Sequence, residues 1–400
     1  MTDAIAAATL PPPAPSSGLH HAGRDLKLKH VLFFHRHGDR SPILTKIGQK
    51  WKMTQEELDF WKSRLATEEQ LNKLNSISKV VGSSPSEPPH SPPGQRQLSP
   101  LAQLSSNGVE HMIAKGKSLR DKYQAFIEES GLTSNPHDSV YVLSSNIDRT
   151  IQSVQCLLYG MFHSDDAQHV DNAPVFYVRT LEKNILAPSH AITIFNEIET
   201  IVSDDVAKRS AAEQAEIHAL GEHFKQVLGI PADAKVPWTA IRDGLTCRKA
   251  HDMPFPEGIT EDMFEKLNVY DTWLWHRLYT RFDFCHGAYK EGVAEVYNHL
   301  HRVVDPSAAQ DSKPKISFFS AHDNSIVALV SALQLQVGPV LPEYGTVVAF
   351  EVYQDQTTSE SYLHVLFEGR PVAFAGHEHD AVCPFSYFET RAKAFIDGKH

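Results

Sequence analysis

The sequence VLFFHRHGDRSP, residues 31–42, decides how this chain folds. Its first four residues are apolar and too few for a helix before the glycine, which indicates a buried β-strand over residues 30–34. The strand ends in a turn where Arg36 and Arg40 flank His37 and Gly38. Arginine presents a planar fork of donors that matches phosphate oxygens, and neutral histidine has a ring nitrogen that can attack phosphorus. The stretch therefore predicts a strand that ends at an anion-binding, nucleophilic turn.

The bulk composition limits the kind of partner that the chain can bind. It has 400 residues, of which 41% are hydrophobic, and a net charge of −11. This acidity disfavours nucleic acid as a partner, so a cationic site has to be local. No window is long and apolar enough to cross a bilayer, so no transmembrane segment is expected.

The N-terminal region and the cysteines bear on the compartment. Residues 1–24 are expected to be a flexible tail, because their short apolar run lacks a preceding basic residue and ends at three prolines, which makes a poor secretory signal. The chain has 4 cysteines, none with metal-ligand spacing. We therefore expect a cytoplasmic location rather than a lysosomal or secreted one.

A strand, a polar turn and a helix recur at three distant places, which indicates an α/β fold with a mainly parallel sheet flanked by helices. The expected strands are residues 30–34, 139–143 and 315–320, and the expected helices are residues 107–128, 148–161 and 325–333. Residues 346–353 and 361–367 alternate around a polar turn and predict C-terminal antiparallel edge strands.

Residues 181–304 show long amphipathic stripes and predict an inserted, mainly helical cap subdomain. The α/β core is then formed by residues 25–180 and 305–400. Serine, proline and glycine dominate residues 76–100, which predicts a long mobile loop inserted in this core. The loop is either a surface insertion without function or a segment that overhangs the site.

Three polar turns follow the three expected parallel strands. The first contains Arg36, His37 and Arg40, and the second contains Arg149. The third contains His322 and Asp323. Because ligands bind beyond the carboxyl ends of the strands in open parallel sheets, we expect these side chains to form one site.

This set suits phosphoryl transfer, because arginines stabilise the charge on the equatorial oxygens of the transition state. We expect His37 to attack phosphorus and form a phosphohistidine, while Asp323 protonates the departing oxygen and later accepts a proton from water. The side chains expected to hold the phosphoryl group are Arg36, Arg40, Arg149 and the imidazolium of His322. Since side chains supply the cations, no metal or other cofactor is expected.

Several of these residues also have an ordinary structural interpretation. Arg149 alone could be a cation on a helix surface, and Asp323 could cap a helix beside a packed histidine. The cluster of acidic and histidine residues at 377–380 could suggest a metal site. Because it does not have the spacing of a recognised set of metal ligands, it is better interpreted as a solvated turn.

The motifs resemble those of the histidine acid phosphatase family, within the histidine phosphatase superfamily. Residues 36–42 resemble its active-site signature, residues 320–323 its second signature, and residues 148–150 the segment with its third phosphate-binding arginine. The resemblance implies an α/β phosphomonoesterase with a helical cap that acts on a phosphorylated small molecule. It also implies that His37 is the nucleophile, Asp323 the proton donor, and Arg36, Arg40, Arg149 and His322 the phosphate ligands.

Other functions remain compatible with some of these motifs. A phytase shares both signatures, but the acidic composition gives no sign of the extra cations that inositol polyphosphates require. A phosphoglycerate-mutase-like phosphotransferase is disfavoured by Arg40 and Asp323. A non-catalytic protein that binds phosphorylated ligands is disfavoured by the intact His37. The sequence indicates neither the natural substrate nor the oligomeric state.

Overall fold

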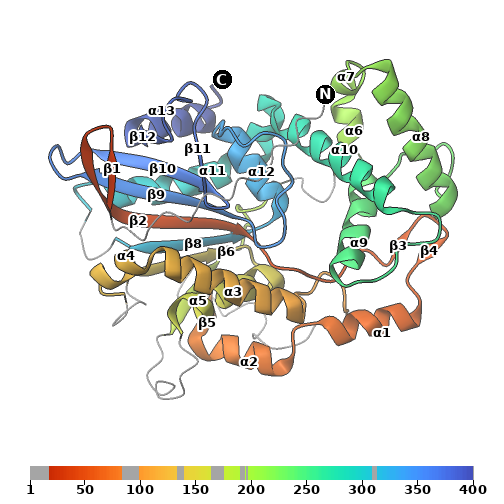
Figure 1. Cartoon of the computed structure of the whole chain (residues 1–400), viewed down its shortest axis with the longest axis horizontal. Helices are drawn as coiled ribbons and strands as arrows, with labels where there is room; N and C mark the ends of the chain where they lie inside the picture. The colour runs from red at the N-terminus through yellow and green to blue at the C-terminus, as the bar shows by residue number, and fades with distance from the viewer. Residues whose placement is uncertain are drawn as a thin grey trace.

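The computed structural model describes residues 18–82, 99–132, 139–163, 175–189, 194, 197–308 and 313–399. A broad twisted sheet with helices on both faces forms one part of the molecule, and a group of helices extends beyond the carboxyl ends of its parallel strands (Figure 1). The expected α/β fold class is therefore confirmed.

The main sheet joins a parallel half to an antiparallel half. Its strands follow the order β11-β10-β9-β2-β8-β6-β7-β5, with β1 added to β2 and β12 added to β10. The strands are β1 Gly18–His21, β2 Arg24–Arg36, β5 Ser78–Val81, β6 Val140–Ser144, β7 Phe176–Thr180, β8 Ile316–Ala321, β9 Val347–Asp355, β10 Ser361–Phe367, β11 Arg370–Val372 and β12 Val382–Pro384. A separate small pair consists of β3 Lys46–Ile47 and β4 Trp51–Lys52.

The position of β2 sets the architecture. It pairs in parallel with β8, which in turn pairs in parallel with β6, so the three strands end at the same edge. On its other side β2 pairs with β9, which runs antiparallel and continues into β10. The expected C-terminal antiparallel strands are thus present, and β9 connects them to the parallel half.

Alternating side chains of β2 divide the hydrophobic core into two layers. Leu32 and Phe34 belong to the cluster that packs under the helices on one face. Val31 and Phe33 belong to the cluster on the opposite face. This follows from the period of two in a strand, and it explains why the predicted strand is apolar without interruption.

The second of these faces is covered by α3 Ser106–Lys122 and α5 Asp148–Phe162, with α4 Gln124–Glu129 following α3. The helix expected over residues 107–128 is divided at Tyr123, whose φ of −106° and ψ of 17° end α3. A Cβ atom on Gly160 would collide with the carbonyl oxygen of Ile113. The absence of a side chain there lets α3 and α5 pack closely, which fixes the start of α5 relative to the sheet edge.

The first face is covered by α11 Phe282–Val304, α12 Asp323–Ala332 and α13 Phe385–Ile396, with α10 Glu261–Tyr279 packed on α12. The sequence placed α11 in the cap. In the structure it packs against α12 and α13, because its stripe of Val293, Val296 and Leu300 belongs to the core over the sheet. The cap range expected over residues 181–304 therefore extends too far.

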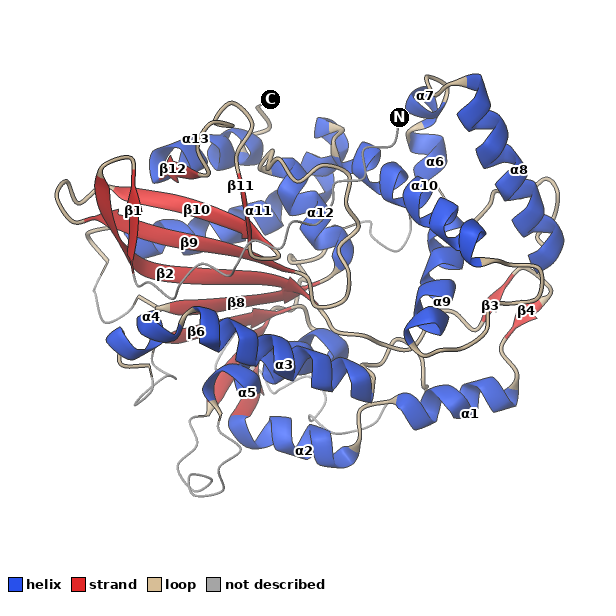
Figure 2. Cartoon of the chain, viewed as in Figure 1, coloured by secondary structure: helices blue, strands red, loops and turns tan. Residues whose placement is uncertain are grey.

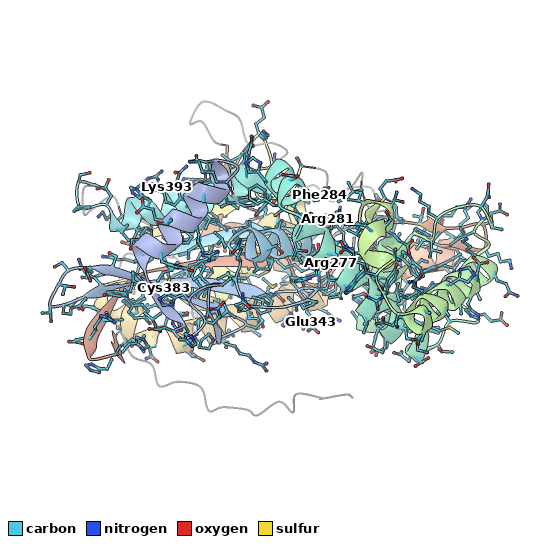
Figure 3. All side chains as sticks on the ribbon, turned by 90° about the horizontal axis from the view of Figure 1, so that it is seen from above. Arg277, Arg281, Phe284, Glu343, Cys383 and Lys393 are labelled. Atoms are coloured by element: carbon cyan, nitrogen blue, oxygen red, sulfur yellow. The ribbon has the colours of Figure 1, made fainter. Side chains whose placement is uncertain are left out.

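The cap consists of α6 Ile198–Ile201, α7 Ser203–Val206, α8 Ala211–Leu228 and α9 Trp238–Ala250, together with the outer part of α10. Asp205 of α7 accepts hydrogen bonds from Arg277 at 2.5 Å and from Arg281 at 2.7 Å. Both arginines lie where the sheet part meets the cap helices, as Figure 3 shows from above. These ion pairs attach the cap to α10 and to the start of α11.

Two predicted boundaries are wrong. Residues 18–24 were assigned to a flexible tail, but Gly18–His21 forms β1 and pairs with the first residues of β2. Residues 76–81 were assigned to a mobile loop. They form the end of α2 Glu68–Ile77 and the strand β5, because the β-branched pair Val80-Val81 joins β7 at the edge of the sheet. Residues 1–17 of the predicted tail and residues 83–98 of the predicted loop lie outside the described residues.

The remaining described helix is α1 Gln55–Arg64, capped by Thr54, whose side chain accepts a hydrogen bond from the Glu57 amide.

Two further observations concern the chain as a whole. All four cysteines are free and buried. Across the described residues, no helix combines the length and the apolar character that a membrane crossing requires.

Candidate active site

The candidate site lies at the edge where β2, β8 and β6 end. In Figure 2 the arrowheads of these strands point toward the region between the sheet and α9. The rings of His37, after β2, and His322, after β8, are 5.6 Å apart between centroids. The His37 amide also donates to the Ala321 carbonyl at 3.2 Å. The parallel register therefore brings the first and third predicted turns together.

His37 is held in one tautomer. Its Nδ1 donates to the carbonyl oxygen of Gly38 at 2.8 Å, so the proton is on Nδ1 and the lone pair is on Nε2. Burial, and then the charges of Arg149, Arg36 and Arg40, lower the pKa of His37 well below its usual value. The ring is therefore neutral even in acidic buffer, which is the state that a nucleophile requires.

The backbone around His37 is fixed by helices on the α3 and α5 side. The Gly38 amide donates to Ser153 Oγ at 2.9 Å, and Ser153 in turn donates to the carbonyl of Arg149 at 2.6 Å. A Cβ atom on Gly38 would lie 2.7 Å from Cγ of Met112 in α3. The glycine of the motif thus permits the close approach of α3, and Ser153 ties the first turn of α5 to the motif.

Arg36 is restrained on three sides. One terminal nitrogen donates to the Pro342 carbonyl at 2.6 Å, and the other forms an ion pair with Asp323 Oδ2 at 2.9 Å. Its guanidinium carbon lies 4.3 Å from the ring centroid of Tyr344. Because the side chain is only 5% exposed, these contacts leave it little conformational freedom.

Arg40 is held by the cap. One terminal nitrogen pairs with Asp243 of α9 at 2.7 Å, and the other donates to the Ser41 carbonyl at 3.0 Å. Burial alone would lower the pKa of Arg40, but the Asp243 carboxylate raises it well above the usual value. Asp243 also accepts from the Ile43 amide at 3.1 Å, so one carboxylate orders both the arginine and the turn.

Arg149 has far weaker partners. Among the described residues its guanidinium has only a long hydrogen bond of 3.4 Å to the Ala102 carbonyl, and its Nε has none. Burial, and then the charge of Arg40, lower its pKa to about 10. A buried cation without a direct ion pair among the described residues favours the binding of an anion beside it.

His322 lies before the first turn of α12, with its Nε2 buried and without a partner among the described residues. Burial, and then the charge of Arg149, lower its pKa to about 3. The surrounding arginines thus disfavour another positive charge on His322, and the imidazolium expected beside a bound phosphoryl group stays a prediction. A bound phosphate would oppose this effect by adding negative charge.

Asp323 is ionised in this arrangement. Burial would raise its pKa, but Arg36, Arg242 and Arg40 together hold it well below the usual value. Its Oδ1 also accepts a hydrogen bond from the Asn324 amide at 2.8 Å. A role as proton donor therefore requires that a bound phosphate first neutralise part of the arginine charge.

The sequence did not single out the cap residues that complete the site. Asp243 has no recognisable motif, and its contact with Arg40 bridges distant parts of the chain. Asp39 lies inside the motif, and its role is now visible, because its carboxylate accepts from Ser105 Oγ at 2.5 Å and from His251 Nε2 at 2.7 Å. Its central place in the motif was the only signal that could have indicated this.

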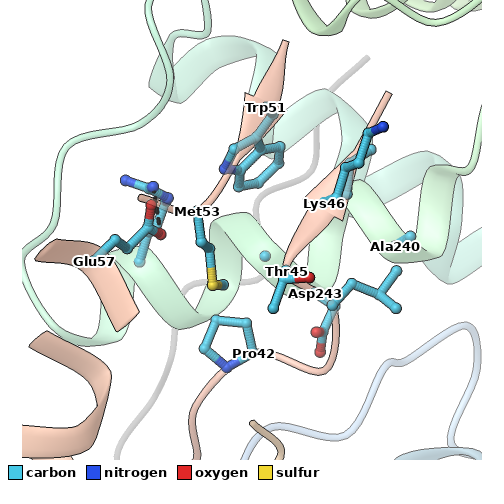
Figure 4. A pocket seen from close by; sticks show the side chains of 12 residues that line it. Pro42, Thr45, Lys46, Trp51, Met53, Glu57, Ala240 and Asp243 are labelled. Carbon is cyan, nitrogen blue, oxygen red and sulfur yellow. Dashed lines mark hydrogen bonds and ion pairs between the residues drawn. The ribbon is translucent and has the colours of Figure 1, made fainter. Parts of the chain in front are cut away.

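Beside Asp243 there is a small hollow between the loop that follows the motif and α9 (Figure 4). Pro42, Thr45, Trp51 and Met53 line it together with Asp243. Its volume of about 10 Å³ is enough for roughly one water molecule. The hollow is therefore part of the support for Asp243 and is too small to take a substrate.

The site contains three arginines, two of which pair with an aspartate, Asp323 or Asp243. Within the described ranges, no group of three or more histidine, cysteine, aspartate or glutamate side chains could hold a metal ion. The positive charge available to a phosphoryl group comes from Arg36, Arg40 and Arg149. Such a site can bind a phosphate monoester and present its phosphorus to His37.

The chain belongs to branch 2 of the histidine phosphatase superfamily, whose family model matches residues 27–368. It is 26% identical to counting factor 60 of Dictyostelium discoideum, over 94% of this chain and 88% of that protein. It is 25% identical to lysophosphatidic acid phosphatase type 6 of Bos taurus, over 91% of this chain and 82% of that protein. Human prostatic acid phosphatase is 26% identical, over 74% of this chain and 77% of that protein.

Solved structures share the fold. A Hafnia alvei phytase in complex with tartrate has a TM-score of 0.59 at 16% identity, with 94% of this chain and 98% of that chain covered. A Bifidobacterium longum multiple inositol polyphosphate phosphatase in complex with inositol hexasulfate has a TM-score of 0.54 at 10% identity, with 97% of both chains covered. With its family and its acid phosphatase relatives, the protein is a phosphomonoester hydrolase of the histidine acid phosphatase type.

Proposed function

We propose that the protein hydrolyses the phosphate monoester of a small molecule through a phosphohistidine at His37. The observation that carries this proposal is the hydrogen bond of 2.8 Å from Nδ1 to the Gly38 carbonyl. It leaves Nε2 unprotonated and directed away from the backbone contact. It also stabilises the positive charge that the ring acquires when Nε2 bonds to phosphorus.

The arginines define where the phosphoryl group binds. Arg36 and Arg40 are each partly neutralised by an aspartate, whereas Arg149 has only a long contact with a carbonyl. The contact with Arg149 therefore contributes most to the binding free energy of an incoming phosphate. The phosphate shares the other two arginines with their paired carboxylates. His322 completes the set, since a proton on its Nε2 could be donated to a phosphoryl oxygen.

Asp323 is the proton donor in this proposal. When the phosphate binds Arg36, the charge that lowers the pKa of Asp323 is partly cancelled, so the carboxyl can take up a proton. As the bond between phosphorus and Nε2 forms, the bond to the alcohol oxygen breaks and that oxygen receives the proton from Asp323. Water then attacks phosphorus and gives its proton to Asp323, and the P–N bond breaks to release phosphate and neutral His37.

A direct test is to trap the intermediate. Enzyme mixed with ³²P-labelled p-nitrophenyl phosphate is quenched in alkali within milliseconds, because phosphohistidine is stable to alkali and labile to acid. We expect label on a peptide that contains His37. An actively hydrolysing sample that never yields a modified histidine would overturn the proposal, since inline attack by water would then explain turnover.

The proton donor can be tested through the leaving group. Asp323→Asn keeps the size of the side chain but cannot donate an acidic proton, so turnover of an alkyl phosphate should fall by roughly 10³-fold. Turnover of p-nitrophenyl phosphate, whose leaving group departs without protonation, should fall far less. Measuring kcat for both substrates separates the roles, and an equal loss for both would assign Asp323 to phosphate binding instead.

A further inference from the structure

Arg242 is a buried arginine of α9 and is next to Asp243 in the chain. Its side chain is 8% exposed, and its Nε donates to Asp271 Oδ2 at 2.5 Å. Asp271, on α10, is fully buried and accepts at its other oxygen from Thr239 at 2.8 Å. Trp275 donates to the same Thr239 hydroxyl at 3.2 Å. The Nε atom of Arg242 is thus held in place by a buried network of hydrogen bonds.

The contact pattern of Arg242 is the reverse of that seen for the arginines around it. Arg36, Arg40 and Arg248 each use both terminal nitrogens and leave Nε without a partner. Arg242 uses Nε, and among the described residues its two terminal nitrogens have no acceptor. An arginine that only neutralised Asp271 would be expected to use its terminal fork, which is the strongest geometry for a carboxylate.

Arg242 is linked through its neighbours to the residues of the site. Arg242 adjoins Asp243, which contacts Arg40, and it is anchored on α10, which packs against both α9 and α12. Asp323 is the first residue of α12. In agreement with this placement, Arg242 follows Arg36 among the charges that lower the pKa of Asp323.

We propose that Arg242 is a specificity-determining residue whose terminal nitrogens bind a second acidic group of the substrate, next to the ester oxygen that Asp323 protonates. The proposal rests on the function proposed above and adds the substrate class: phosphomonoesters whose alcohol carries a carboxylate or another phosphate close to the ester carbon. The terminal nitrogens have no acceptor among the described residues, and such a group would supply one for the planar fork. The acidic composition of the whole chain conceals this local cation, which only the fold brings to the site.

The test compares two substrates that differ in one group. In 2-phosphoglycerate a carboxylate replaces one hydroxymethyl group of glycerol 2-phosphate, with the ester carbon unchanged. We expect kcat/KM of the native enzyme to be at least about tenfold higher for 2-phosphoglycerate. Arg242→Lys keeps the positive charge and can still pair with Asp271 but loses the fork, so this preference should disappear. Turnover of p-nitrophenyl phosphate should change less than about threefold.

Arg248→Lys is the matched control, because Arg248 lies on the same helix and its terminal nitrogens already contact Glu57 and Pro254. It should retain the native preference. Should Arg242→Lys melt at a much lower temperature than Arg248→Lys, the double variant Arg242→Gln/Asp271→Asn removes both buried charges together and should show the same loss of preference.

The outcomes distinguish this inference from the proposed function. A native enzyme without preference for 2-phosphoglycerate, or a preference retained in Arg242→Lys, overturns the role of Arg242 while p-nitrophenyl phosphate turnover still supports the phosphatase. An equal loss for all substrates would assign Arg242 to support of Asp323 and would also overturn it. A native enzyme that hydrolyses none of the three substrates overturns both.

Discussion

Two pairs of buried imidazoles lie beside β2 and β8, yet only one pair is surrounded by the groups of a phosphoryl-transfer site. Beyond the carboxyl ends of the strands lie His37 and His322, with ring centroids 5.6 Å apart. Near the start of β8 lie His30, in the middle of β2, and His299 of α11, with centroids 5.5 Å apart. All four have a lowered pKa, and burial is the first cause in every case.

What separates the pairs is their surroundings. His30 donates to the Pro314 carbonyl at 2.9 Å, and His299 bonds to the Ser317 hydroxyl at 2.8 Å, within a set of aromatic rings. The other pair faces arginines whose positive charge is only partly neutralised. A buried histidine with a displaced pKa is therefore a weak sign of function by itself, and the nearby unsatisfied cations carry the inference.

The largest effect should come from replacing the nucleophile. We expect His37→Ala to lower kcat by roughly 10⁵-fold, the scale on which the loss of a covalent nucleophile acts. His30→Gln, in the middle of the same strand, should keep kcat within about twofold. Steady-state hydrolysis of p-nitrophenyl phosphate measures both, and comparable losses in the two variants would remove the functional distinction between the pairs.

A smaller effect should follow from replacing Arg149, the site arginine without a paired carboxylate. Arg149→Lys keeps a charge but loses the planar fork, so kcat/KM should fall by roughly 10²-fold, as expected when a donor to the transition state is removed. Arg179→Lys is a suitable control, because Arg179 contacts the Tyr141 ring and the Tyr177 carbonyl instead of the site. If Arg149→Lys matched that control, the phosphate would have to bind mainly through Arg36 and Arg40.

The smallest effect concerns acid stability. Unfolded histidine takes up a proton near pH 6.5, whereas His30 and His35 in the fold do so only at a pKa of about 4. The unfolded state therefore gains protons first as the pH falls, so the stability that these residues contribute is full above pH 6.5 and is lost toward pH 4. His30→Gln should reduce the difference in unfolding free energy between pH 7 and pH 4.5 by about 2 kcal/mol.

Urea unfolding at the two pH values measures this effect. His20→Gln is the control, because the His20 side chain is 89% exposed and the variant should keep the native dependence on pH. If the unfolding free energy of the His30→Gln protein depended on pH as that of the native protein does, the His30 imidazole would not be held neutral by burial.

The sequence predicted most of the sheet because its signals are local. Short apolar runs before glycine or polar turns identified β2, β6 and β8, and helical spacing identified α3, α5 and α12. The errors have local causes as well. β1 and β5 are short strands at polar or serine-rich boundaries, and their pairing with β2 and β7 supplies the stability that composition does not show.

The residues of the site also fall into those that the sequence predicts and those that only the fold reveals. His37, Arg36 and Arg40 share one turn, so their proximity could be seen in the chain, and the parallel arrangement predicted that the turns with Arg149 and with His322 and Asp323 would join them. The contact of Asp243 with Arg40 could not be predicted, because a helix without a motif delivers it. The lowered pKa of His322 could not be predicted for a related reason, since it depends on the number of arginines that the fold brings close.

The sequence alone therefore determined the strand-and-turn framework and the chemical groups at its edge, because these depend on neighbouring residues and on the geometry of parallel strands. Only the tertiary structure decided the direction of each pKa shift, the partners of each arginine and the terminal nitrogens of Arg242 that have no acceptor among the described residues. Those properties depend on burial and on charges a few ångströms apart in space, and residues far apart in the chain supply them.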